Sequence, residues 1–181
     1  QWITGAEARQ DVQRWRARSP VLLTGVGTVL ADDPRLTLRP EALSELDDTD
    51  RAALAGRPHY RLVLDRQLRT PPTAQLFSSP GVVLFHGPEA DSVRAKALED
   101  AGATLVALSG PEAEAPFDAV GAWCAARDLG DVLLECGPTL AAAALSQNAV
   151  DEVLLYQAPL ILGADARPLA ALTLATLAEA K

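Results

Sequence analysis

Short apolar runs that alternate with helix-like segments constrain the fold of this chain more than any other feature. Runs of strand length occur at 19–25, 60–65, 81–87, 104–110 and 131–137, and a further run opens the segment 150–166. Helical periodicity marks the segments 4–19, 26–33, 89–102, 117–130 and 138–148. Near-continuous apolar strands that alternate with helices are typical of a parallel sheet buried on both faces. We therefore expect a three-layer α/β domain, with helices on both faces of a mostly parallel sheet.

The composition indicates a single globular domain without structural metal. At 181 residues the chain is long enough for one well-cored domain. No apolar run approaches the roughly 20 residues that span a bilayer, and the first ten residues show no signal-peptide pattern. Two cysteines, Cys124 and Cys136, and two histidines are too few for a disulfide framework or a zinc site. We expect a cytoplasmic protein with no metal.

The net charge of −8 argues against a nucleic-acid-binding protein, which would present a basic face. The same charge would oppose the binding of a phosphorylated small molecule. Local arginines and helix N-termini would then have to attract the phosphate. Arg16, Arg35 and Arg39 are the candidates for this role.

One candidate site lies where the apolar run 131–137 meets the helical segment that follows it. Gly137 permits close approach to the backbone, and Pro138 suits the first turn of a helix. The N–H groups of residues 139–141 would then form an anion site at the edge of the sheet. Taken alone, these residues are better explained by an ordinary strand-to-helix turn, which is far more common than a phosphate site. Glu135 favours a ligand site, because a carboxylate at the end of a buried strand needs a partner.

A second candidate site lies in the stretch "GVGTVLADDPRLTLR" at 25–39. Thr28 and Asp32 are four residues apart, which places them on one face of a short helix. Arg39 follows closely enough to reach an anionic group. In the alternative interpretation, Asp33 and Pro34 only end the helix and the charges are solvated.

The motifs together resemble a known family across nearly the whole chain. "QWIT" with the following "AR.DVQ", then "GVGTVLADDPRLTLR", "RLVLD..LRTP", "LLECGPTLAAAAL" and "VDEVLLYQAPLILG.DA" occur in order. This pattern resembles the reductase domain of the bifunctional riboflavin-biosynthesis deaminase/reductase, whose fold is related to that of dihydrofolate reductase. The resemblance implies that residues 1–181 belong to this reductase domain. It also implies that the domain's first and final strands, and the zinc-binding deaminase domain, lie outside the sequence.

The resemblance implies an enzyme that uses NADPH to reduce 5-amino-6-(5-phosphoribosylamino)uracil to the ribitylamino compound. The opened ribosylamine would accept hydride at C1′, while the protein aligns donor and acceptor and excludes water. Two alternatives remain open. One is another pteridine- or dihydrofolate-type NADPH reductase, and the other is a catalytically silent nucleotide-binding fragment. A homodimer is expected, with the apolar segment 150–162 as its interface.

The resemblance also implies roles for particular residues. The cofactor positions are Trp2, Thr28, Asp32, Gly137, Pro138, Thr139, Leu140, Ala141, Ala142 and Ala143. The substrate positions are Arg16, Leu36, Arg39 and Glu135. Arg66 replaces the serine that is usual in the family after "VLD", and we expect it to pair with the 2′-phosphate of NADPH. No residue matches a dedicated proton donor.

Overall fold

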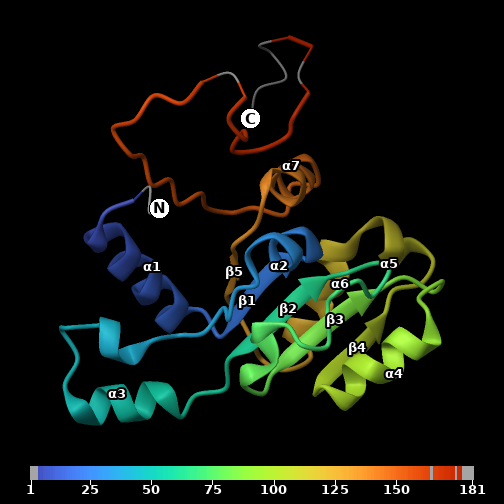
Figure 1. Ribbon diagram of the computed structural model, residues 1–181, viewed down its shortest axis with the longest axis horizontal. Helices are drawn as coiled ribbons and strands as arrows, with labels where there is room; N and C mark the ends of the chain where they lie inside the picture. Colours follow the sequence, from blue (N-terminus) through green and yellow to red (C-terminus); the bar gives the residue numbers. More distant parts are fainter. Residues whose placement is uncertain (1–3, 164, 174, 177–181) are drawn as a thin grey trace.

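Five parallel strands form the sheet at the centre of the protein (Figure 1). The computed structural model describes residues 4–163, 165–173 and 175–176. The strands are β1 (Val21–Gly25), β2 (Tyr60–Leu64), β3 (Val82–His86), β4 (Ala103–Ala107) and β5 (Val132–Leu134). Their spatial order is β4-β3-β2-β1-β5, and every neighbouring pair is parallel. The expected parallel α/β sheet is therefore confirmed.

Helices cover both faces of this sheet. The α-helices are α1 (Ala6–Arg18), α2 (Val26–Asp32), α3 (Asp48–Ala55), α4 (Ser92–Asp100), α5 (Pro111–Glu114), α6 (Pro116–Ala125) and α7 (Pro138–Ser146). Two short 3-10 helices, η1 (Pro40–Ala42) and η2 (Gln75–Ser78), lie in the connections. In Figure 1, α1 and α3 lie to one side of the sheet, while α7 follows β5. None of the described helices combines the length and the apolar character that crossing a membrane requires.

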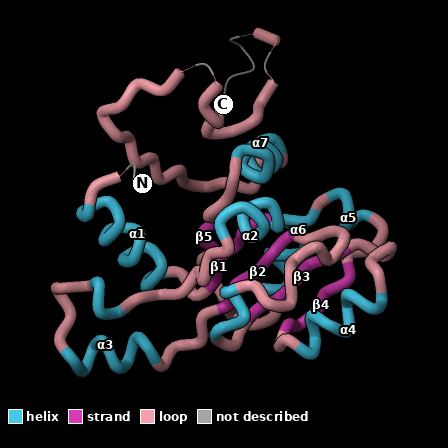
Figure 2. Tube along the Cα trace, viewed as in Figure 1, coloured by secondary structure: helices cyan, strands magenta, loops and turns pink. Residues whose placement is uncertain are grey.

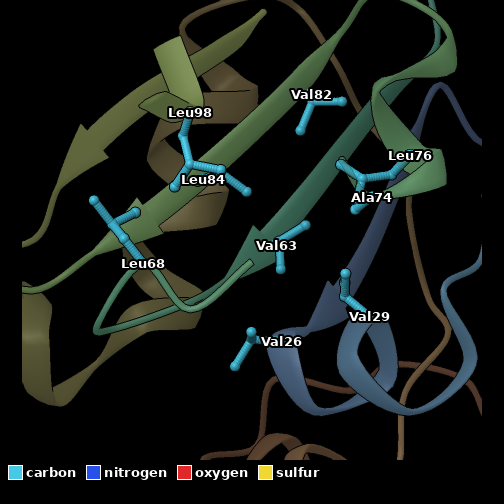
Figure 3. Packing of buried hydrophobic residues seen from close by; sticks show 9 residues of the cluster. All are labelled: Val26, Val29, Val63, Leu68, Ala74, Leu76, Val82, Leu84 and Leu98. Carbon is cyan, nitrogen blue, oxygen red and sulfur yellow. The ribbon is translucent and has the colours of Figure 1, made fainter. Parts of the chain in front are cut away.

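The hydrophobic core has two halves, one on each face of the sheet. Successive strand residues point to opposite faces, so Val63 and Leu84 lie in one half while Leu62 and Val83 lie in the other. The first half joins the sheet to α2, η2 and α4, and Figure 3 shows its side chains converging between these elements. The second half joins the sheet to α6, where Trp123 contacts the rings of two strand residues edge-on.

The strand order creates a topological switch point between β1 and β5. From β1 the chain adds β2, β3 and β4 in one direction, and it then returns to place β5 on the other side of β1. In open α/β sheets, ligands bind outside the carboxyl ends of the strands at this kind of position. The loops that follow β1 and β5 therefore form the expected location of a site.

The structure corrects the prediction for one segment and details another. Residues 150–166 were expected to begin with a strand, but their described residues form no strand and run as an extended loop (Figure 2). Most of their apolar side chains stay exposed, including Val153, Leu155 and Ile161. The polar segment 40–58 lies mostly exposed and contains α3, whose N-terminus is capped by the side chain of Asp47.

Candidate functional site

A cleft of about 880 Å³ lies at the carboxyl ends of β1, β2 and β5. One wall comes from residues 25–36, which follow β1, and the opposite wall comes from residues 135–143, which follow β5. Arg16 from α1 and Leu64 at the end of β2 complete it from the sides. Its volume falls within the range of sites for cofactors and other small molecules, and its position coincides with the topological switch point.

The N-terminus of α7 opens into this cleft. Gly137 is the N-cap residue, and no described side chain caps the helix end. The N–H of Ala141 donates to the carbonyl oxygen of Gly137 at 3.1 Å, and Pro138 carries no N–H. The expectation that the Ala141 amide is free is therefore wrong. The amides of Thr139 and Leu140 are the ones that this helix end presents to an anion.

Close packing brings the two walls together behind α7. A Cβ atom added to Gly25 would lie 3.2 Å from Cδ2 of Leu140, which is tighter than an ordinary contact. Glycine at this position therefore lets the end of β1 approach α7. Gly25 is followed directly by α2, and it packs against Leu140 of α7. This contact fixes the distance between the two walls of the cleft.

Arg16 and Glu135 form a bidentate ion pair in the cleft. Nε and Nη2 of Arg16 donate to Oε1 and Oε2 of Glu135, each at 2.7 Å. Nη1 donates to the carbonyl oxygen of Thr37 at 2.8 Å. A guanidinium has five N–H groups, so one on Nη1 and one on Nη2 remain for a ligand. The carboxylate at the end of β5 therefore has a protein partner, and that partner is another of the four expected substrate residues.

The loop after α2 forms the wall that faces α7. Thr28 and Asp32 both line the cleft, as their spacing on one helix face predicts. Leu36 also lines it and is buried with a positive φ of 50°, a conformation that costs a bulky residue on the order of 1–3 kcal/mol. Asp33 ends α2 in the left-handed region, and its Oδ1 accepts from the backbone N–H of Gln75 at 2.8 Å.

A tight turn after β2 is built around the buried carboxylate of Asp65. Its Oδ1 accepts from the N–H of Arg69 at 2.9 Å, and its Oδ2 accepts from the N–H and hydroxyl of Thr70, each at 2.7 Å. Leu68 has a φ of 51° and is fully buried, pointing into the core cluster (Figure 3). The turn is thus fixed by a buried carboxylate and a buried leucine.

This turn faces two different cavities. Arg69 lines the main cleft, whereas Arg66 lines a separate pocket of about 140 Å³. The smaller pocket lies beside the ends of β2 and β3 and is mostly apolar, with Phe85 and Leu108 in its walls. Leu64 lines both cavities, so they are neighbours along the same edge of the sheet.

The structure brings most of the expected site residues to the main cleft. Those that line it are Arg16, Thr28, Asp32, Leu36, Glu135, Gly137, Pro138, Thr139, Leu140 and Ala143. Arg39 does not line it, and its backbone N–H donates to Oε1 of Gln13. Arg66, Ala141 and Ala142 also lie outside the lining, while Trp2 falls outside the described residues.

Two arginines in the cleft were missed by sequence reasoning. Arg69 sits five residues beyond a strand end, and this position was the signal that could have identified it. Arg167 comes from the loop after α7, and nothing local in the sequence marks it. The loop is held near the cleft because the N–H of Ala171 donates to the carbonyl oxygen of Pro138 at 2.9 Å.

Cys136 also lines the cleft, between the acidic end of β5 and the start of α7. Burial raises the pKa of its thiol to about 11. The thiol is therefore protonated at neutral pH and is a poor nucleophile. The cleft accordingly has the features of a binding and orienting site for an anionic ligand rather than those of a covalent one.

Comparison with known proteins gives consistent matches across the chain. The family model described as the RibD C-terminal domain matches residues 1–176. The riboflavin biosynthesis protein RibD of Escherichia coli (strain K12) is 39% identical over 177 residues, which cover 95% of this chain and 46% of that protein. The 5-amino-6-(5-phosphoribosylamino)uracil reductase of Buchnera aphidicola is 28% identical over 174 residues, which cover 93% of this chain and 79% of that protein.

A solved structure shows the same fold. Acinetobacter baumannii RibD matches with a TM-score of 0.79 and 32% sequence identity, covering 99% of this chain and 46% of that protein. The chain thus spans about half the length of the RibD proteins that it matches. The expected resemblance in fold and sequence is confirmed over the region that is shared.

Proposed function

This chain belongs to the RibD C-terminal domain family, and on that premise we propose that it reduces 5-amino-6-(5-phosphoribosylamino)uracil with NADPH in riboflavin biosynthesis. The product would be 5-amino-6-(5-phosphoribitylamino)uracil. One observation carries the proposal. A cleft at the topological switch point combines the uncapped amides of α7 with the Arg16–Glu135 pair.

The cleft fits a dinucleotide cofactor. The amides of Thr139 and Leu140 are available to bind an anion, because no described side chain caps this helix end. A diphosphate at this position would receive backbone hydrogen bonds together with the favourable end of the helix dipole. Thr28 and Asp32 on the opposite wall would meet the remainder of the cofactor. When bound, the reduced nicotinamide supplies the hydride for the reaction.

The protein's own contribution to the reaction is orientation. The two remaining N–H groups of Arg16 form a fork for oxygen atoms of the substrate, and Glu135 fixes the direction of that fork. The buried Leu36 closes the wall beside it and limits the entry of water. A fixed donor and acceptor geometry in a partly dry cleft favours transfer between the two bound molecules.

We assign Arg66 to cofactor selection. Its guanidinium belongs to a turn at the end of β2, and the neighbouring pocket is apolar enough to hold a planar base. A guanidinium there would pair with the 2′-phosphate that distinguishes NADPH from NADH. Replacing Arg66 with alanine should then reduce the preference for NADPH over NADH about tenfold or more. An unchanged preference would exclude this role.

The proposed reaction is tested by the absorbance of NADPH at 340 nm after addition of the ribosylaminouracil phosphate. A substitution at Thr139 adds a structural test of the cofactor site. Thr139→Pro removes one amide from the α7 terminus at a position where proline is tolerated, whereas Thr139→Ala retains that amide. We expect the proline variant alone to weaken NADPH binding about tenfold. Equal binding by both variants would contradict the proposed cofactor site.

The proposal extends to partners and location. We propose a cytoplasmic homodimer whose interface includes the exposed apolar residues of the loop after α7, among them Val153, Leu155 and Leu162. Light scattering of the wild type and of a Leu155→Asp variant would test this. A wild-type monomer would contradict it. The deaminase activity expected of longer family members would belong to a separate domain.

Two alternative functions differ in their products. A pteridine- or dihydrofolate-type reductase would oxidise NADPH with those substrates and leave the ribosylaminouracil phosphate unchanged. A catalytically silent nucleotide-binding fragment would bind NADPH without turnover. The two N–H groups that Arg16 keeps beside the cofactor site favour a substrate that presents oxygen acceptors, and therefore favour the sugar phosphate.

A further inference from the structure

We propose that Arg69, presented by the turn at 65–70, binds a phosphate group of the ligand in the main cleft. The inference rests on the proposed function, because it deepens the description of the same cleft. Arg69 stands in the quoted motif "RLVLD..LRTP", but the resemblance gives it no role, and the two candidate sites of the sequence analysis do not contain it. Three observations support it: the construction of the turn, the distribution of charge in the cleft, and the divergence of two arginines on one turn.

The turn holds Arg69 through its backbone. Oδ1 of Asp65 accepts from the N–H of Arg69, while Oδ2 is occupied by both donors of Thr70. Asp65 is fully buried, and these hydrogen bonds stabilise its carboxylate as the cation of an ion pair otherwise would. A buried carboxylate is costly unless it is well hydrogen-bonded, so its presence fixes one conformation of the turn. The side chain of Arg69 therefore starts from a fixed position at the edge of the cleft.

The charges of the cleft leave Arg69 available to an anion. Arg16 is neutralised by its two hydrogen bonds to Glu135. Among the residues that the structure describes, Arg69 forms no ion pair, and it is an exposed residue that lines the cleft. The chain as a whole carries a net charge of −8. An unpaired guanidinium in a cleft of such a protein is the group expected to offset the charge of a phosphorylated ligand.

Arg66 provides an internal comparison on the same turn. Its side chain runs beside Gly87, where an added Cβ would lie 3.2 Å from Cγ of Arg66, and it lines the smaller pocket. Arg69 lines the main cleft that contains the α7 terminus. The two guanidinium groups therefore serve different cavities, and replacing each should have a different effect on ligand binding.

The test measures binding by isothermal titration calorimetry with NADH, NADPH and ribose 5-phosphate as probes. The variants are Arg69→Ala, Arg69→Lys, Arg66→Ala and, as a matched control on the exposed face of α4, Arg94→Ala. NADH carries the diphosphate alone, NADPH adds the 2′-phosphate, and ribose 5-phosphate represents the substrate's phosphate. Circular dichroism and thermal melting verify that each variant is folded. NADPH oxidation is measured separately with the ribosylaminouracil phosphate.

We expect Arg69→Ala to weaken the binding of both NADH and NADPH by about tenfold to a hundredfold, and Arg69→Lys to recover part of this affinity. Arg94→Ala should bind like the wild type, and Arg66→Ala should affect NADPH alone. A loss limited to ribose 5-phosphate would also support phosphate binding by Arg69, with the substrate as its source. Wild-type affinity of Arg69→Ala for all three probes would overturn the inference.

The two proposals fail in different ways. A wild type that binds dinucleotide but leaves the ribosylaminouracil phosphate unreduced would refute the proposed reaction. The inference would stand in that case if Arg69→Ala still lowered dinucleotide affinity. Active enzyme with an unaffected Arg69→Ala variant would retain the proposed reaction and refute the role of Arg69. A wild type that binds none of the probes would refute both.

Discussion

Breaking the Arg16–Glu135 ion pair should destabilise the protein far more than breaking an exposed pair of the same type. The two hydrogen bonds are each 2.7 Å long and join α1 to the end of β5 across 119 positions of sequence. The side chains are 12% and 27% exposed. We therefore choose the cycle of Arg16→Ala, Glu135→Ala and the double variant as the perturbation.

The expected magnitude follows from the burial of this pair. Removing one partner of a fully buried pair costs about 3–5 kcal/mol, whereas exposed pairs contribute about 0–1 kcal/mol. Arg16 and Glu135 lie between these limits, and their bidentate geometry uses both carboxylate oxygens. We expect a coupling free energy of about 2 kcal/mol between the two substitutions.

The assay is urea unfolding at neutral pH, followed by circular dichroism. The Arg14–Glu45 pair is a matched control, because it joins the same residue types at 2.6 Å with side chains 45% and 43% exposed. Its cycle should give a coupling of about 0.5 kcal/mol or less. Similar coupling energies for the two pairs would refute the argument that partial burial makes the Arg16–Glu135 pair structurally important.

Two further predictions concern the backbone and the pH dependence of stability. Gly81 has a φ of 98°, and an added Cβ would lie 2.5 Å from the carbonyl oxygen of His59, so Gly81→Ala should lower the free energy of unfolding by about 3 kcal/mol or more. Gly102→Ala, at a φ of 100° with no atom within 4 Å, should cost about 1 kcal/mol, and equal losses would show that the contact is unimportant. Burial and the hydrogen bond to Asp11 raise the pKa of Tyr156 to about 12. The phenol of Tyr156 ionises near pH 10 in the unfolded chain. Its contribution to the free energy of unfolding is therefore fully present below about pH 10 and is lost as the pH rises toward 12. Urea unfolding of wild type and Tyr156→Phe should therefore show a difference that is constant from pH 7 to 10 and then shrinks; a constant difference at higher pH would contradict the assignment.

The strands of the sheet could be predicted because their signal is local. Each expected run at the five sheet positions overlaps an observed strand, from Val21–Gly25 to Val132–Leu134. Continuous apolar runs bounded by glycine and polar residues indicate buried parallel strands on composition alone. The site walls were predictable for the same reason, since both follow directly from the ends of strands. Most of the residues expected after the ends of β1 and β5 line the cleft, whereas Arg66, Ala141 and Ala142 do not.

The segment 150–166 could not be predicted because strand formation there depends on a partner. Its apolar residues have the composition of a strand, yet a strand forms only when a neighbouring edge supplies hydrogen bonds. In the structure the segment is tied down instead by single contacts, such as the bond of 2.6 Å from the Tyr156 hydroxyl to Asp11. Arg167 escaped prediction for the same reason, because a non-local hydrogen bond from Ala171 holds its loop beside α7.

The distribution of charge explains how an acidic chain can present a cleft for an anionic ligand. Arg16 donates hydrogen bonds to Glu135 and to the carbonyl oxygen of Thr37. Its positive charge therefore mainly stabilises the contact between α1 and the end of β5. Arg69 and Arg167 form no ion pair with any residue that the structure describes, and both line the cleft. Of these three arginines, Arg16 is positioned to orient a bound ligand, whereas Arg69 and Arg167 are available to attract its negative charge. Because the attraction is local, ligand affinity should fall with ionic strength even though the net charge of the protein repels the ligand.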